Sequence, residues 1–283
     1  TTPQDAVVSQ LPVTYAQADD AGTIDSYEWG PDCDPETGRV KVPSNYSPPC
    51  VVARPGAPGL NTAQGVTRDK IVIVAYGAPD DDLSAALQAN SDSAEAIADT
   101  RQKVIEMFED RYELWGRRIE IVRMKGTGSS ETAARADAVR VAEEIGAFAS
   151  LGGPGQQGAY AEELANRGVL CIGCGLSVPN SAFLENAPYM WGNLQTPEQY
   201  LINVGDYIVG RLLGRKAEFA GDPAMRRRTR VFGQVHFEQD PPVFKGVSAE
   251  VEKQGKARGY KAAAKLTYQL IIPELAEQAG ELQ

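Results

Sequence analysis

The chain has 283 residues, of which 42% are hydrophobic and 23% are charged, so it can bury a substantial core and is expected to form one or two soluble globular domains. Its 28 Lys and Arg against 38 Asp and Glu give a formal net charge of -10. This argues against a nucleic-acid partner, because binding to the phosphate backbone needs clustered basic residues. The sequence contains no run of about 18 apolar residues, so a membrane-spanning helix is not expected.

Residues 1–66 are predicted to form an irregular extension, because they are rich in Pro, Gly, Asp and Thr and show no periodic apolar face. Cys33 and Cys50 lie at the two ends of the segment CDPETGRVKVPSNYSPPC. Such a segment is held against a folded body only by a cross-link or by a partner, so a Cys33–Cys50 disulfide is favoured. This bond would close a loop of roughly 18 residues and contribute on the order of 3 kcal/mol.

From residue 70 onward, strand and helix patterns alternate. Residues 70–76 (KIVIVAY) form a β-branched run, which is typical of a strand buried on both faces of a parallel sheet. The following segments predict a helix over 93–114, a strand over 118–124, a helix capped by Ser130, a strand over 147–151, a helix over 156–166 and a strand over 169–172. This order predicts an α/β fold with a doubly wound parallel sheet and right-handed crossovers.

The alternation continues to the end of the chain. A short strand over 188–191 and a helix that opens at Pro197 and runs to about residue 213 extend the first lobe. The basic run 225–230 (MRRRTR) is interpreted as a solvated linker. After it, a strand over 230–237, a helix over 243–257 and a strand over 264–270 predict a second lobe. The expected domains are the extension (1–66), a first α/β lobe (67–216) and the start of an incomplete second α/β lobe (217–283).

Two Gly-rich turns follow neighbouring predicted strands, within residues 150–158 (SLGGPGQQG) and 169–177 (VLCIGCGLS). In open α/β sheets, ligands bind beyond the carboxyl ends of the strands, and tight Gly turns allow the backbone to approach a ligand closely. We therefore expect a binding site at these turns. The alternative is that the glycines only shape the turns, while Gln156, Gln157 and Ser177 cap the helices that follow.

The second cysteine pair, Cys171 and Cys174, has the C-x-x-C spacing of redox motifs, in which a thiolate is stabilised at a helix N-terminus. Here the pair closes a strand, and the chain has one histidine, His236, so neither redox catalysis nor a zinc site is expected. A structural disulfide or two small buried thiols remain as interpretations.

The sequence contains neither of two common motifs, that of serine hydrolases and that of nucleotide-binding enzymes. The chain has no G-x-S-x-G elbow and no Walker A lysine after its Gly turns, so we expect a binding protein and not an enzyme, with no cofactor and no metal. The acidic run at residues 80–82 lacks the alternating ligands and the Gly turn of a calcium loop, and it is interpreted as a solvated loop.

The segments GVTRDKIVIVAYG, MFEDRYELWGRRIEIV, SLGGPGQQG and VLCIGCGLS, in this order and spacing, resemble the first lobe of the type I periplasmic solute-binding proteins. These are the substrate receptors of ABC importers, related to the branched-chain amino acid binders. The resemblance covers about residues 65–283. It implies a two-lobed receptor that closes on a small-molecule solute and delivers it to the membrane subunits of an ABC importer.

The resemblance also implies an extracytoplasmic location, either periplasmic or at the cell surface, with membrane association through a lipid anchor that this sequence does not contain. The chain begins at Thr1 without a Met, which agrees with a mature or trimmed product and leaves export open. A complete second lobe needs over a hundred residues, so further sequence is expected beyond Gln283.

Carried onto this chain, the resemblance implies a solute site formed by the two turns, next to a helix N-terminus whose partial positive charge suits an anion. The first turn supplies Gly155, Gln156 and Gln157, and the second supplies Gly175 and Ser177. Gln157 departs from the family, which usually has Ser there, and its longer amide would narrow the site or offer both a donor and an acceptor.

Two further positions follow from the resemblance. Gln195 stands where amino-acid binders have a carboxylate, and a neutral site stabilises an α-ammonium poorly, so amino-acid specificity is not expected. In the second lobe Phe244 is the expected closing residue, near Asp240 and His236, unless it packs in the core of that lobe. Two other functions remain open, a ligand-sensing domain of a receptor or regulator and a non-transport interaction module on the same fold.

Overall fold

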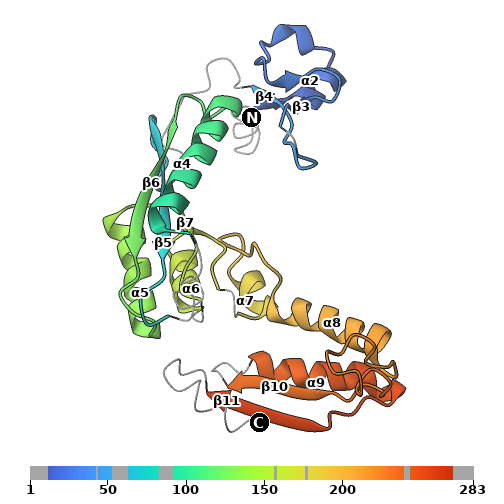
Figure 1. The fold of residues 1–283 in the computed structure, drawn as a ribbon. Coiled ribbons are helices and arrows are strands. Elements are labelled where there is room, and N and C mark those ends of the chain that lie inside the picture. The colour runs from blue at the N-terminus through green and yellow to red at the C-terminus, as the bar shows by residue number, and fades with distance from the viewer. Residues whose placement is uncertain are drawn as a thin grey trace. The chain divides into compact units, whose positions relative to one another are not determined.

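The computed structural model describes residues 12–42, 44–52, 63–82, 92–155, 158–175, 178–238 and 243–269 (Figure 1). Contacts between residues divide the chain into two compact units. The first unit comprises Thr1–Ile73, Asn90–Val122 and Gly146–Phe148, and the second comprises Val74–Ala89, Arg123–Ile145 and Ala149–Gln283. The domain boundaries expected after residues 66 and 216 stay a prediction.

The N-terminal extension contains short regular elements that the sequence did not predict. Helix α2 (Tyr15–Asp20) is capped by the side chain of Thr14, which forms a reciprocal pair with Gln17. Strand β1 (Val13–Thr14) pairs antiparallel with β4 (Val51–Val52), and β2 (Cys33–Asp34) pairs antiparallel with β3 (Arg39–Val40). The Cys33–Cys50 disulfide joins β2 to the residue before β4. Short strands and one cross-link therefore hold a segment that has little core of its own.

A five-stranded sheet forms the centre of the fold. Its strands stand in the order β6-β5-β7-β8-β9, with the bounds β5 (Lys70–Gly77), β6 (Arg118–Lys125), β7 (Ala149–Leu151), β8 (Leu170–Ile172) and β9 (Met190–Trp191). Strands β7, β8 and β9 pair in parallel. Because β5 has β6 on one side and β7 on the other, the strand order reverses at β5, as in a doubly wound sheet. The predicted α/β fold class is confirmed.

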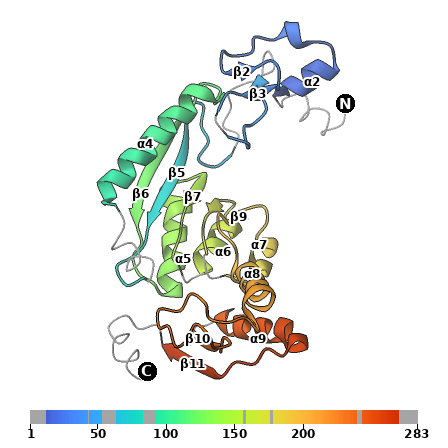
Figure 2. The same cartoon turned by 45° about the vertical axis from the view of Figure 1, so that its right-hand side comes forward.

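Helices connect the strands. Helix α4 (Ala94–Arg111) lies beside β6 in both views, and α5 (Glu131–Val139) packs against α6 (Ala159–Asn166) (Figures 1 and 2). Ser93 and Ser130 cap α4 and α5 through their side-chain oxygens. Four fully buried apolar side chains belong to the core of the second unit: Val74, Val141, Leu164 and Val169.

The chain then continues through α7 (Asn180–Glu185) and α8 (Pro197–Tyr207) to the C-terminal elements. Strand β10 (Gly233–Glu238), α9 (Val243–Gly255) and β11 (Ala264–Gln269) form a βαβ unit in which the two strands are parallel. Helix α9 packs against α8. The bounds agree with the predicted elements within a few residues. None of the described helices is both long and apolar enough to cross a membrane.

Candidate functional site

The two Gly turns lie next to each other at one edge of the sheet. Strand β7 pairs in parallel with β8, with Leu151 opposite Ile172 at the end of the ladder. The ladder continues one residue into the first turn, because the N–H of Gly152 donates to the carbonyl of Ile172 at 2.9 Å. Gly152 and Gly173 both have φ values near the left-handed region, +79° and +73°, which turn the chain sharply after each strand. The expected adjacency of the turns is confirmed.

The point at which the strand order reverses lies between β5 and β7, and ligands of doubly wound sheets bind at such points. Asp82 follows β5 and is only 1% exposed. Its Oδ2 accepts a hydrogen bond from the N–H of Gly155 at 3.2 Å. The loop after β5 is thus tied to the first Gly turn by a buried carboxylate, a contact that the sequence did not reveal.

The acidic run at residues 80–82 has a different partner for each of its members. Asp80 forms an ion pair with Lys125 at 2.7 Å, at the end of β6. Asp81 accepts hydrogen bonds from the N–H and the hydroxyl of Ser129, which lower the pKa of its carboxyl. The prediction of a solvated loop is therefore wrong for Asp82. Its carboxylate is buried and accepts a hydrogen bond from a backbone N–H of the turn.

Buried hydroxyl groups support the end of β7. Ser150 and Tyr160 are fully buried, and their oxygens lie 2.8 Å apart. The hydroxyl of Ser150 also lies 3.1 Å from the carbonyl of Gly152, to which it can donate. Burial raises the pKa of Tyr160 above its ordinary value, so the phenol stays protonated. These contacts fix the strand from which the first Gly turn departs.

A second buried carboxylate lies behind the same strand ends. Asp137 is 1% exposed and accepts hydrogen bonds from the hydroxyl of Tyr76 at 3.0 Å and from the N–H and hydroxyl of Thr127 at 2.9 and 3.0 Å. The ring of Tyr76 packs at 4.8 Å from that of Tyr160. Burial, reinforced by the nearby Asp137 carboxylate, raises the pKa of Tyr76. The ends of β5, β6 and β7 are therefore held by a satisfied polar network.

The predicted residues of the first turn are only partly described. The N–H of Gly155 donates to Asp82, and the assignment of Gly155 to a solute site stays a prediction. Gln156 and Gln157 lie outside the described residues. Helix α6 begins at Ala159 after Gly158, which provides no side-chain cap.

In the second turn, Gly175 is buried with φ +72°, and a Cβ placed there would lie 2.9 Å from Val178 and 3.0 Å from Met190. Both the positive φ and the close packing therefore favour a glycine at this position. Ser177 lies outside the described residues. The Cys171–Cys174 disulfide links the end of β8 to this turn, and both cysteines are buried, so the structural interpretation of this pair fits its surroundings.

Gln195 is exposed and lies at the edge of a cavity of about 10 Å³ that Cys174, Gly175 and Thr196 also line. A cavity of this size can hold about one water molecule and no larger solute. The next residue, Thr196, caps α8 in a reciprocal pair with Gln199, so the neutral sequence around Gln195 serves to start a helix.

For the site residues of the predicted second lobe, the structure describes few contacts. Phe244 lies in α9, but its side chain is outside the described part of the structure, as is Asp240. His236 Nδ1 lies 3.3 Å from the hydroxyl of Ser248, on the side of β10 that faces α9. The described residues contain no group of three or more His, Cys, Asp or Glu that could hold a metal ion.

This architecture is found in solved structures of solute-binding proteins. A solute binding protein of an ABC transporter from Rhodopseudomonas palustris BisB5, in complex with 3,4-dihydroxybenzoic acid, is 14% identical over 76% of this chain and 52% of its own, with a TM-score of 0.51. An extracellular ligand-binding receptor from Rhodopseudomonas palustris HaA2 is 16% identical over 76% of this chain and 51% of its own, with a TM-score of 0.50.

A solute binding protein of an ABC transporter from the same HaA2 strain, in complex with p-hydroxybenzoic acid, is 12% identical over the same shares, with a TM-score of 0.50. The chain thus has the fold of the type I solute-binding proteins and spans about half the length of these structures. No family model matches the sequence, and no curated protein matches it either.

Proposed function

We propose that this chain belongs to an extracytoplasmic receptor that captures a small polar molecule between two lobes and delivers it to an ABC importer. The observation that carries the proposal is the position of the two Gly turns, side by side at the carboxyl edge of the sheet and next to the point where the strand order reverses. Solved structures with this fold are binding proteins with small ligands, and the proposed role is accordingly binding and not catalysis.

The proposed site comprises Gly175, Ser177 and Gln157 with their neighbours Gly155, Gln156 and Gln195, and Phe244 would close over the solute from the second lobe. Closure would be a hinge motion that is stabilised by contacts made only in the shut state. Two of the similar structures hold hydroxybenzoic acids, so aromatic carboxylates are the first class of solute to test.

A panel of hydroxybenzoates, amino acids, amides and sugars tests this function by thermal shift with the full chain. At a concentration of 100 times Kd, a solute that binds only the native state is expected to raise Tm by about 5 °C. Ser177→Ala and Gln157→Ala should reduce this shift, and Ser26→Ala, which changes an exposed hydroxyl in the extension, should not. The absence of a shift with every class would contradict the proposed receptor.

The proposed location is tested separately by counting thiols under denaturing conditions. The structure contains the disulfides Cys33–Cys50 and Cys171–Cys174, and disulfides persist in oxidising compartments. We expect no free thiol in protein isolated from its natural compartment. Four free thiols would argue against export.

A further inference from the structure

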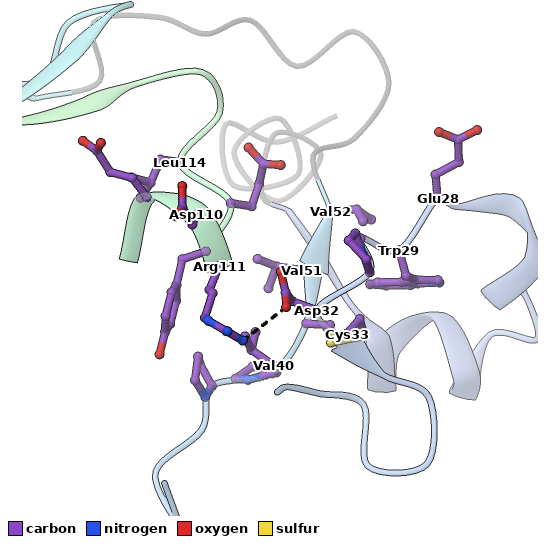
Figure 3. A pocket seen from close by; sticks show the side chains of 18 of the residues that line it. Glu28, Trp29, Asp32, Cys33, Val40, Val51, Val52, Asp110, Arg111 and Leu114 are labelled. Atoms are coloured by element: carbon purple, nitrogen blue, oxygen red, sulfur yellow. Dashed lines mark hydrogen bonds and ion pairs between the residues drawn. A yellow bond between two sulfur atoms is a disulfide. The ribbon is translucent and has the colours of Figure 1, made fainter. Parts of the chain in front are cut away.

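A cavity of about 670 Å³ lies in the first unit, between the extension and the end of α4 (Figure 3). It is lined by residues 28–33, Val40, residues 48–52, residues 109–114 and residues 116–118. Its volume lies within the range of roughly 300–1,000 Å³ that is usual for small-molecule sites. None of its lining residues belongs to the proposed solute site, so a ligand of this cavity would bind independently of that site.

Specific contacts hold the two walls of the cavity. On the extension side, the Cys33–Cys50 disulfide fixes two lining residues. Across the cavity, Arg111 at the end of α4 forms an ion pair with Asp32 at 3.3 Å and donates to the carbonyl of Lys41 at 3.0 Å. Figure 3 shows this bridge between Arg111 and Asp32, with Trp29 and Val52 on the extension side.

The charge of the lining is negative. Five carboxylate and three guanidinium side chains belong to residues that line the cavity: Glu28, Asp32, Glu109, Asp110 and Glu113, and Arg111, Arg117 and Arg118. Each arginine already has a partner in the protein. Arg111 pairs with Asp32, Arg118 with Glu109 at 2.7 Å, and Arg117 Nε donates to the carbonyl of Thr67 at 2.7 Å.

Two of the carboxylates have no partner of this kind among the described residues. Glu28 and Asp110 are exposed, and no residue in the described part of the chain forms a hydrogen bond or ion pair with either side chain. The C-terminal end of the 18-residue helix α4 adds partial negative charge at the same wall. The net negative charge of the lining, five carboxylates against three guanidinium groups, therefore favours a cation over an anion.

The other lining groups indicate the kind of cation. Val40, Val51, Val52 and Leu114 are apolar, and the half-buried indole of Trp29 belongs to an aromatic cluster with Tyr15 at 4.9 Å. Indole rings attract ammonium and guanidinium groups through their π faces. A bare metal ion fits less well, because no group of three or more metal-ligating side chains occurs among the described residues. We propose that this cavity binds a small organic cation, with an ammonium or guanidinium group attached to an apolar body.

The proposal is tested by NMR on the full, oxidised chain, using the indole N–H signals of the three tryptophans, Trp29, Trp115 and Trp191. Trp29→Phe assigns the signal of Trp29. The probes are 2-phenylethylammonium, the neutral 2-phenylethanol and the anionic phenylacetate, which share one apolar body. We expect the cation alone to shift the Trp29 signal at millimolar concentration, and added salt to weaken the effect.

Matched variants test the role of charge. Glu28→Gln combined with Asp110→Asn should weaken binding of 2-phenylethylammonium by about tenfold, because both negative charges are removed while both side chains keep their size. Glu218→Gln removes an exposed carboxylate of the second unit and should leave the affinity unchanged. The remaining signals of each variant report that it is folded.

Several results would overturn the proposal. One is an equal shift of the Trp29 signal by the alcohol or by phenylacetate, and another is an unchanged affinity of the double variant. A Trp29 signal that 2-phenylethylammonium does not move would also overturn it.

Discussion

At the scale of single residues, the contact between Asp82 and Gly155 is the one that most directly shapes the candidate site. A buried carboxylate at the end of the loop after β5 holds the backbone of the turn after β7. Buried polar groups are usually satisfied in pairs, and removal of one member leaves the other without a partner. Asp82 is therefore expected to position the turn without touching a solute.

Asp82→Ala should lower the free energy of unfolding by about 1–3 kcal/mol, because the N–H of Gly155 loses its buried acceptor. Asp82→Asn keeps an oxygen acceptor and should cost less. Asp80→Ala is the matched control, since Asp80 is 89% exposed and its ion pair with Lys125 is worth about 0–1 kcal/mol. Urea denaturation measures all three, and equal losses for Asp80→Ala and Asp82→Ala would contradict the assigned role.

Asp81 gives a prediction about pH. The N–H and hydroxyl of Ser129 hold its pKa below the ordinary value of 3.8, so its contribution to stability is complete above that value and is lost as the pH falls through the lower pKa of the folded state. The stability difference between the native chain and Asp81→Asn should therefore be largest near neutral pH and vanish at low pH. Denaturation curves from pH 7 down to pH 2 measure this stability difference. A difference that grows as the pH falls would contradict the assigned hydrogen bonds of Asp81.

The sequence predicted the Gly turns but not the residues that support them. Glycines after a strand mark a tight turn by themselves, because few other residues adopt positive φ. An acidic run, in contrast, looks solvated in a sequence, and only the tertiary fold shows that Asp82 is buried while Asp80 is exposed. The same holds for Ser150 and Tyr160, whose hydrogen bond depends on how α6 packs against β7.

At the scale of elements, long segments with a strong period were predicted well and short ones were not. The β-branched run of β5 and the amphipathic pattern of α4 fix these elements within a few residues of their observed ends. Strands β1 to β4 have two residues each, which is too short for any period to show. They form because the disulfide and the aromatic contacts of Trp29 bring their chains together.

Removal of the Cys33–Cys50 disulfide tests this account of the extension. Cys33→Ser with Cys50→Ser should destabilise the extension by about 3 kcal/mol and raise hydrogen exchange over residues 12–52. Cys171→Ser with Cys174→Ser, which removes a bond closing a much shorter loop, should leave exchange in that range unchanged. Unaltered protection of residues 12–52 in the first variant would show that the disulfide is not needed to hold them.

The second Gly turn provides a prediction that separates packing from backbone conformation. Gly175→Ala and Gly214→Ala both force an alanine to positive φ, at +72° and +73°, which costs roughly 1–2 kcal/mol. At Gly175 the new methyl group would also overlap Val178 and Met190, whereas at Gly214 nothing lies within 4 Å. Gly175→Ala should therefore be more destabilising by about 1 kcal/mol or more. Equal losses in thermal unfolding would contradict the observed packing of the turn.

For the whole molecule, the prediction of the fold was based on the order of strands and helices along the chain. Strand–helix alternation with two Gly turns one helix apart is enough to predict a doubly wound sheet with a binding edge, and the similarity to solved solute-binding proteins bears out that fold. The identity of the solute does not follow from the sequence. The side chains at the two turns decide it, and they can differ without changing the pattern that specifies the sheet.

The most direct test of the proposed function is a crystal structure of the full chain with the solute that the thermal-shift panel selects. We expect electron density for that solute at the carboxyl edge of the sheet, in contact with the turn after β7 and the turn after β8, beside Gln157 and Ser177. Density for the solute elsewhere, with both turns free of ligand, would contradict it.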